Sequence, residues 1–260
     1  MQRYVTISLL MAGLSVLSFA QTNPRVIEVV PKTVAGTIMV YAGQGGTLSI
    51  DGYDATRLRA NGSAIVYVNS AGTYELMIRF DDGAQETLKV DVQTDTPVSA
   101  GFGYAIGDYG PGGGRIFYVK EQYSEGWRYL ECASHDVGPT QWGLNGTDVS
   151  GTGTQLGTGK QNSRLLLERM YQVGERNRAV QSCATYNEGG FTDWFLPSKN
   201  ELDLIYRNLH TDGYVTLTDN YYWSSSQYND GYVWCQLFQD GSQGYGSKNY
   251  TFCVRPIRSF

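Results

Sequence analysis

The sequence predicts an α+β protein, with a small all-β sandwich domain first and a domain that mixes strands and helices second. Between residues 24 and 98, apolar and polar side chains alternate with period two, as in half-buried strands. Over residues 103–260, strand-like runs are mixed with segments whose apolar residues recur at helical spacing. All five tryptophans and all four cysteines follow residue 120, which supports a domain boundary before it.

Residues 1–20 predict a signal peptide, and therefore export to the periplasm, the cell surface or the extracellular space. Arg3 precedes an apolar run, and the small residues Ser18 and Ala20 suit a signal peptidase, which places cleavage before Gln21. The alternative is a transmembrane anchor, but the run is short for a bilayer span and polar residues follow it directly. The first cysteine is Cys132, so we expect no lipid anchor at the cleavage site.

The composition restricts the classes of partner. The chain has a net charge of −5 and only 17% charged residues, so it lacks the basic surface that nucleic acids and anionic membranes attract. We therefore expect no nucleic-acid partner and, once the leader is removed, no membrane span. Four cysteines in 260 residues do not form a disulfide scaffold, although an oxidising envelope permits bridges.

The first domain is predicted to contain a hairpin. Apolar residues alternate along residues 74–80 and again along 88–92, and Asp82 and Gly83 between them favour a turn. This pattern predicts two antiparallel strands with one buried face. Nothing in this domain suggests a reactive site, because it has no histidine and its acids fall in turns or on solvent faces.

A further strand is expected at residues 46–50, ending in a turn at Asp51 and Gly52. This strand, residues 71–74 and the hairpin come in an order that resembles a PEGA-type module. The resemblance implies a spacer or envelope-associated module over residues 24–98. Residues 99–102 are assigned to a linker between the domains.

The second domain begins with two predicted strands and continues with helices. Leu166, Met170 and Val173 recur at helical spacing and are expected on one face of a helix. Ser198 and Glu201 have the spacing of a capping box, in which the serine hydroxyl accepts the Glu201 amide proton and the carboxylate reaches back. The expected elements are strands at 115–119 and 126–132, helical stretches from Ser163 and around 179–183, a capped helix after Ser198, and strands after Asn220.

Two patterns suggest cofactor or metal chemistry, and neither holds in detail. Residues 153–161 resemble a phosphate-binding loop, but Thr154 stands where that loop needs glycine and Gln161 where it needs a hydroxyl for magnesium. His135 and His210 have no metal-ligand spacing, and no nucleophile-elbow pattern occurs. We therefore expect no catalytic residue, no metal site and no cofactor, so the protein is predicted not to be an enzyme.

Cys235 and Cys253 are candidates for a disulfide. They lie in two runs of alternating apolar residues around a loop near Gly244, and pairing about that centre would place them opposite each other. The alternative is two independent thiols. Cys183 lies on a helical stretch and is expected to be a small buried apolar residue.

Residues 221–252 combine tyrosine and tryptophan with serine, glycine, asparagine and glutamine, which is the composition of a paratope. Alternation places Tyr232 and Trp234 on the strand face opposite Val233 and Leu237, which need burial. The alternative is an ordinary tyrosine-rich sheet with polar turns. The predicted ligand-binding residues, expected to form one exposed patch, are Tyr228, Asn229, Asp230, Tyr232, Trp234, Gln236, Gln243, Tyr245, Asn249 and Tyr250.

Several blocks of the second domain carry a family resemblance. They occur at residues 107–111, 113–118, 126–131, 157–162, 193–202, 222–226 and 254–258. In this order they resemble the Lcl C-terminal-like family, which is close to the Fibrobacter succinogenes major paralogous domain. The resemblance implies a C-type-lectin-like fold of the formylglycine-generating-enzyme subtype.

The enzymatic branch of that fold needs a close pair of reactive cysteines near the C-terminus. Cys235 and Cys253 are eighteen residues apart in this chain, so the resemblance does not extend to that chemistry. The final blocks also resemble variable proteins diversified by retroelements, in which residues between a Trp-Ser-Ser entry and a Val-Arg-Pro exit are altered to change the ligand.

The sequence thus predicts an exported envelope or surface protein that binds a protein or glycan through the 228–250 face. The resemblance to variable proteins implies that this face is diversified. One alternative is a structural envelope protein without a discrete ligand. The other is a formylglycine-generating-type oxidase.

Overall fold

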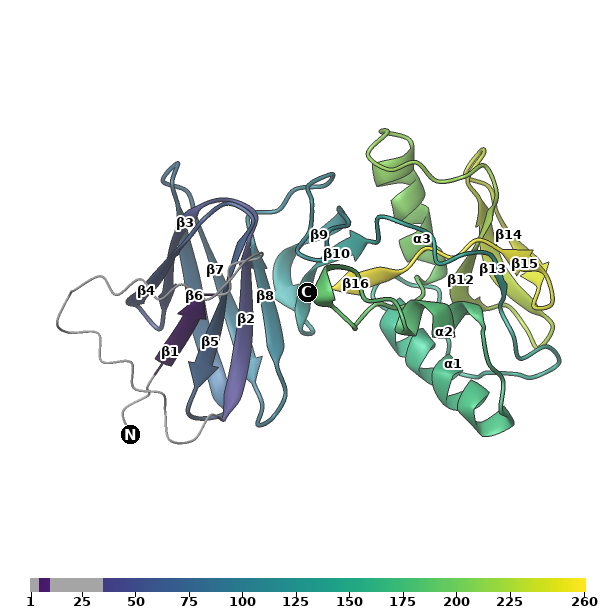
Figure 1. The fold of residues 1–260 in the computed structure, drawn as a ribbon, viewed down its shortest axis with the longest axis horizontal. Helices are drawn as coiled ribbons and strands as arrows, with labels where there is room; N and C mark the ends of the chain where they lie inside the picture. The colour runs from purple at the N-terminus through teal and green to yellow at the C-terminus, as the bar shows by residue number, and fades with distance from the viewer. Residues whose placement is uncertain (1–4, 10–34) are drawn as a thin grey trace. The chain divides into compact units, whose positions relative to one another are not determined.

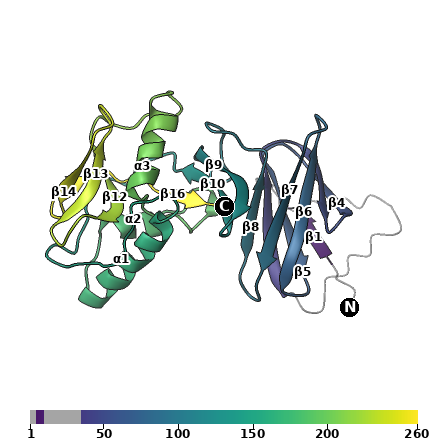
Figure 2. The same ribbon diagram turned by 180° about the vertical axis from the view of Figure 1, so that it is seen from behind.

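The computed structural model describes residues 5–9 and 35–260. The chain divides into two compact units (Figures 1 and 2). Of the described residues, unit 1 contains those up to Tyr104 together with Lys120–Arg128 and Phe260, and unit 2 contains Ala105–Val119 and Tyr129–Ser259.

Unit 1 contains two four-stranded sheets with a shared apolar core. Their orders are β1-β5-β2-β8 and β4-β3-β6-β7, and β8 runs parallel to β2. Ile38 and Val66 of the first sheet and Leu76 of the second are fully buried in that core. The strands are β1 (Val5–Leu9), β2 (Gly36–Ala42), β3 (Gly46–Ile50), β4 (Tyr53–Leu58), β5 (Gly62–Val68), β6 (Gly72–Phe80), β7 (Gln85–Val92) and β8 (Val98–Phe102).

The predicted hairpin and turn are confirmed in unit 1. β6 pairs with β7 in antiparallel register from Gly72 opposite Val92 to Arg79 opposite Gln85. Gly83 in the connecting turn has φ of 90°, a conformation that side chains with a Cβ rarely adopt. The strand predicted at 46–50 is β3, and the turn after it uses left-handed backbone conformations at Asp51 and Gly52.

The N-terminal half differs from the predicted domain boundary. Residues 99–102 are not a linker, because they lie in β8, which pairs with β2 and in which Ala100 and Phe102 are fully buried. The chain turns earlier, around Asp95, which has a positive φ. Most of the predicted signal peptide lies outside the described residues, and its described part, Val5–Leu9, pairs with β5. Signal cleavage remains a prediction.

Unit 2 is built around helices and several small sheets. Its sheets have the orders β16-β10-β9, β11-β15 and β12-β13-β14. The strands are β9 (Arg115–Ser124), β10 (Trp127–Cys132), β11 (Thr140–Gln141), β12 (Tyr221–Gln227), β13 (Tyr232–Leu237), β14 (Gln243–Ser247), β15 (Thr251–Phe252) and β16 (Ile257–Ser259). The part of β9 and β10 within Lys120–Arg128 is assigned to unit 1. The helices are α1 (Gly159–Val173), α2 (Ala179–Ala184), α3 (Lys199–Ile205), a short 3₁₀ turn (Glu188–Gly190) and a π turn (Tyr206–His210).

The helices form close to where the sequence predicted them, although α1 begins at Gly159 rather than at Ser163. Leu166 and Met170 of α1 are fully buried, as their spacing required, while Val173 is 47% exposed at the end of the helix. The capping box at α3 is confirmed, since Ser198 Oγ accepts from the Glu201 amide and the Ser198 amide donates to Glu201 Oε2 at 2.7 Å. No helix in the described part of the chain is long and apolar enough to cross a membrane.

The predicted fold class is wrong. Of the described residues, 41% lie in strands and 16% in helices, and the several sheets give a β-sandwich-like fold rather than a distinct α+β C-type-lectin fold. Helical spacing predicts more helix than forms, because α2 and α3 have only six and seven residues. Much of the second half forms short strands that pair at long range, which local periodicity does not predict.

Candidate functional site

The predicted binding face lies on the sheet β12-β13-β14 (Figure 1). In this sheet β13 pairs with β14 from Tyr232 opposite Ser247 to Gln236 opposite Gln243. The alternation along β13 is as expected, since Val233 is fully buried and Tyr232 is 44% exposed. The sheet therefore positions one row of aromatic side chains outward above a buried row.

Four of the predicted residues form an aromatic cluster, which we define as Tyr228, Tyr232, Trp234 and Tyr245. The rings of Tyr228 and Tyr245 stack with centroids 4.6 Å apart and an interplanar angle of 3°. Trp234 meets Tyr228 edge-to-face at 5.4 Å, and Tyr232 meets Tyr245 in the same way at 5.6 Å. Tyr228 and Tyr245 stay 50% and 56% exposed, so the rings are held by one another and still face solvent.

The helix α3 covers the other end of this face. The ammonium of Lys199, the first residue of α3, lies 3.8 Å from the centroid of the Trp234 ring, a cation–π contact. Gln236 is fully buried, and its Nε2 donates to Asp203 Oδ1 at 3.0 Å. Gln243 Nε2 donates to the Lys199 carbonyl at 2.9 Å. The prediction that Gln236 contacts ligand is therefore wrong, because the helix removes it from solvent.

The turn between β12 and β13 is closed by Asn229. Its Oδ1 accepts from the amides of Gly231 and Tyr232 at 3.0 and 2.9 Å, as in an Asx turn. This use of the asparagine side chain fixes the direction in which Tyr228 and Tyr232 leave the turn. Asp230 is exposed at the tip.

Asn249 and Tyr250 do not join the aromatic cluster. Tyr250 contacts Phe252 at 5.8 Å, and Phe252 also contacts Trp223 at 4.2 Å and Tyr221 at 5.0 Å. The ring contacts therefore form two groups, and Tyr250 belongs to the second. The cause is the turn after β14, which carries the chain toward β15 before it reaches Tyr250.

One residue of this region was missed in the sequence. Lys248 follows β14 and its side chain is fully buried, although lysine is almost never buried without partners. A lysine beside a glycine- and serine-rich loop suggests a solvated turn, so no sequence signal pointed to it.

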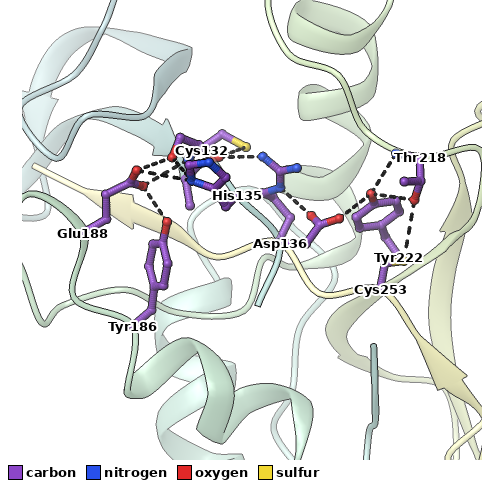
Figure 3. A network of polar contacts seen from close by, with 11 residues as sticks. Cys132, His135, Asp136, Tyr186, Glu188, Thr218, Tyr222 and Cys253 are labelled. Carbon is purple, nitrogen blue, oxygen red and sulfur yellow. Dashed lines mark hydrogen bonds and ion pairs between the residues drawn. The ribbon is translucent and has the colours of Figure 1, made fainter. Parts of the chain in front are cut away.

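A polar network lies elsewhere in unit 2 (Figure 3). Arg255 Nε donates to Asp136 Oδ1 at 2.6 Å, and Arg255 Nη1 donates to the Ala133 carbonyl at 2.8 Å. The Tyr222 hydroxyl donates to Asp136 Oδ2 at 2.9 Å and accepts from the Thr218 amide at 3.0 Å. Asp136 thus joins the segment after β10 to β12 and to the chain before β16.

Glu188 is the second carboxylate of this network. The amide and hydroxyl of Ser134 and the hydroxyl of Tyr186 all donate to it. Burial raises the pKa of Glu188, but these hydrogen bonds outweigh burial, so the pKa lies below its usual range. Because Ser134 donates its only hydroxyl proton to Glu188, the contact from Ser134 to His135 Nδ1 must be donated by the histidine. A serine–histidine–acid triad needs the histidine in the middle, and this order differs.

The thiols are not activated. Burial raises the pKa of Cys132 and of Cys235 to about 12, and it also raises the pKa of Cys183 and Cys253. The thiolate is the reactive form, so these groups are protonated at neutral pH. Among the described residues, no group of three or more histidine, cysteine, aspartate or glutamate side chains could hold a metal ion.

The predicted disulfide between Cys235 and Cys253 is absent, and both are free cysteines. Cys235 lies opposite Gly244, while Cys253 bridges to Tyr222. The prediction was wrong because the hairpin turns over residues 238–242 rather than near Gly244. The run that carries Cys253 therefore comes after β14 and lies along β12.

These features fall within one stretch of the chain that a family model recognises. Residues 132–258 match the Lcl C-terminal domain. The Lcl C-terminal domain match starts at Cys132 and ends at Arg258, so it includes the polar network, the aromatic cluster and Lys248. It supports the resemblance to the Lcl C-terminal family, whereas the PEGA-type and enzyme-subtype resemblances remain predictions.

Among solved structures, the chain is similar to a fimbrial protein from Bacteroides ovatus ATCC 8483. The TM-score is 0.46 and the identity 11%, over 87% of this chain and 71% of that chain. Likeness at this level carries no argument about function. A search of curated proteins gives no match.

Proposed function

We propose that the protein is a surface or envelope protein that binds a protein or glycan through the aromatic cluster. The observation that carries this proposal is the exposure of Tyr228, Tyr232 and Tyr245 together on one sheet face. Exposed aromatic rings grouped on a soluble surface mark an interaction site. The Lcl C-terminal domain match is consistent with a surface or envelope protein.

The packing of the cluster suits binding. Each ring is already held by a neighbour, so little side-chain freedom remains to be lost when a ligand binds. Tyrosine has only two side-chain torsions and offers both a ring and a hydroxyl, so one residue supplies apolar area and hydrogen bonding. The Asx turn at Asn229 fixes the backbone beneath two of the rings.

We propose further that the protein is not an enzyme. This proposal is supported by thiols whose pKa is raised by burial and by a serine whose hydroxyl proton is donated to Glu188. It leaves binding as the activity that the exposed side chains of unit 2 fit best.

Replacement of Tyr245 tests the proposed face. Tyr245 contacts the other three rings of the cluster, so Tyr245→Ala should weaken ligand binding about tenfold or more. Wild type is first screened on a glycan array and on arrayed extracellular proteins, and the affinity of each hit is then measured for the variant. The matched control is Tyr171→Ala, which removes a tyrosine that is 78% exposed on α1.

An equal loss of ligand affinity in Tyr245→Ala and Tyr171→Ala, or no loss in either variant, would contradict the proposed face. A wild-type protein that binds nothing on either array would favour the structural envelope protein. Thermal unfolding of both variants identifies any loss that comes from unfolding.

Export is tested by the mature N-terminus. We expect mass spectrometry of the protein recovered outside the cytoplasm to give a chain that starts at Gln21, because Ser18 and Ala20 suit signal peptidase. A chain that still carries Met1 would contradict cleavage and export by this route.

A further inference from the structure

The side chain of Lys248 is fully buried in unit 2. Its ammonium donates to the carbonyl oxygens of Leu144 and Thr147 at 3.3 and 2.8 Å and to Gln227 Oε1 at 2.8 Å. An ammonium has three protons, so this shell of three oxygens satisfies it completely. The aromatic face of Trp142 lies nearby, with its centroid 4.9 Å from the ammonium.

The oxygens around the ammonium come from two separate segments of chain. Leu144 and Thr147 belong to the loop of residues 143–149 (the 143–149 loop). Gln227 is the last residue of β12. Gln227 also binds that loop directly, since its Oε1 accepts from the Val149 amide at 3.0 Å and its Nε2 donates to Asp148. The ammonium and Gln227 therefore share one polar junction.

Backbone hydrogen bonds extend this junction to the turn that carries the aromatic cluster. The Lys248 amide donates to the Gly231 carbonyl at 3.0 Å, and the Gly146 amide donates to the Asp230 carbonyl at 3.0 Å. The Gly143 amide donates to the Lys248 carbonyl at 3.4 Å. The turn of residues 228–231 and the 143–149 loop thus meet at Lys248.

Charge explains why a lysine can stand in this position. Burial lowers the pKa of Lys248 to about 8, while the carboxylates of Asp230, Asp148 and Glu175 act in the opposite direction. The amine thus carries a proton at neutral pH and keeps all three donors. The neighbouring carboxylates offset part of the cost of burying its charge.

We infer that the Lys248 ammonium is an internal cation that closes the 143–149 loop onto the 228–231 turn and so holds Tyr228 and Tyr232 in place. Lys248 is a positioning residue, because its own side chain is buried and cannot touch a ligand. Its role in binding rests on the proposed function, whereas the closure itself does not.

The test uses Lys248→Ala in the full-length protein, which removes the ammonium and leaves a space bounded by the three oxygens. We expect the amides of Gly146 and Val149 to exchange with solvent about tenfold faster or more, since the acceptors that closed the loop lose their donor. Added propylammonium should restore slow exchange, because it supplies both the chain volume and the charge. Propanol is the matched control, since it has similar volume and no charge.

Restoration by propanol as well as by propylammonium would overturn the inference, because volume alone would then explain the loss. If Lys248→Ala does not fold, Lys248→Met fills the space without a charge and should show the same faster exchange. Slow exchange at Gly146 and Val149 in Lys248→Met would also overturn the inference.

The exchange measurement needs no ligand, so its outcome is separate from the proposed function. Fast exchange in Lys248→Met with unchanged affinity for a ligand found on the arrays would keep the closure and count against the aromatic cluster as the binding site.

Discussion

Replacing Arg258 with methionine is expected to lower the free energy of unfolding by about 3–5 kcal/mol. Arg258 is 1% exposed, and its guanidinium donates to Glu131 Oε2 at 3.2 Å and to Asp193 Oδ1 at 3.0 Å. Glu131 is fully buried, so removal of the arginine leaves a carboxylate without its charge partner. Urea denaturation of wild type and variant measures the difference.

The matched control is Arg164→Met. Arg164 pairs with Glu168 at 3.7 Å, but both side chains are about 60% exposed, so we expect a change below about 0.5 kcal/mol. The double variant Arg258→Met, Glu131→Gln should be more stable than Arg258→Met alone, because the unpaired charge is gone.

If Arg258→Met lowers the free energy of unfolding by less than about 1 kcal/mol, the ion pair of Arg258 with Glu131 contributes little to stability. Such a result would indicate that the backbone amides of Gly112 and Gly114, which also donate to Glu131, are sufficient for its carboxylate.

The second large effect is a pH dependence from Glu201. Burial raises the pKa of Glu201 from 4.5 to about 7, against hydrogen bonds from the amides of Ser198 and Gly157. Between these two values the folded protein holds a proton that the unfolded chain releases. The contribution of this group to stability is therefore complete below pH 4.5 and is lost as the pH rises through 7, by about 3 kcal/mol.

Glu201→Gln isolates this contribution, because glutamine does not titrate. The stability of wild type minus that of Glu201→Gln should fall by about 3 kcal/mol from pH 4.5 to just above pH 7. Glu168→Gln on the exposed face of α1 serves as the control and should show little dependence. A flat difference for Glu201→Gln would mean that the carboxylate is ionised in both states across this range.

Local rules were sufficient for several elements of the fold. The hairpin of β6 and β7 follows from alternation and one glycine turn, and the start of α3 follows from Ser198 and Glu201. Each of these patterns lies within a few residues, where side-chain spacing determines backbone conformation. The sequence did not reveal that Glu201 also binds the Gly157 amide, since that contact joins segments 44 residues apart.

The fold class and part of the site depended on such distant contacts. The alternation along β13 predicts that Gln236 is exposed. In the structure α3 lies over it, and its side-chain amide donates a hydrogen bond to Asp203. Cys235 was paired with the wrong residue because the position of the hairpin turn was misjudged. Tyr228, Tyr232, Trp234 and Tyr245 were expected on one face, and their rings do contact one another, but the expected pairing about Gly244 did not place Trp234 opposite Tyr245.

The contacts of Tyr245 with three other rings also constrain how this surface can change over generations. Substitutions at Tyr228, Tyr232 and Trp234 will not act independently, because each alters the support of a ring that the others share. If this face binds a ligand as proposed, a new specificity would be reached most readily by joint replacement of several ring positions. Libraries that vary one position at a time would sample this surface poorly, whereas combinatorial libraries over all four would include compatible sets.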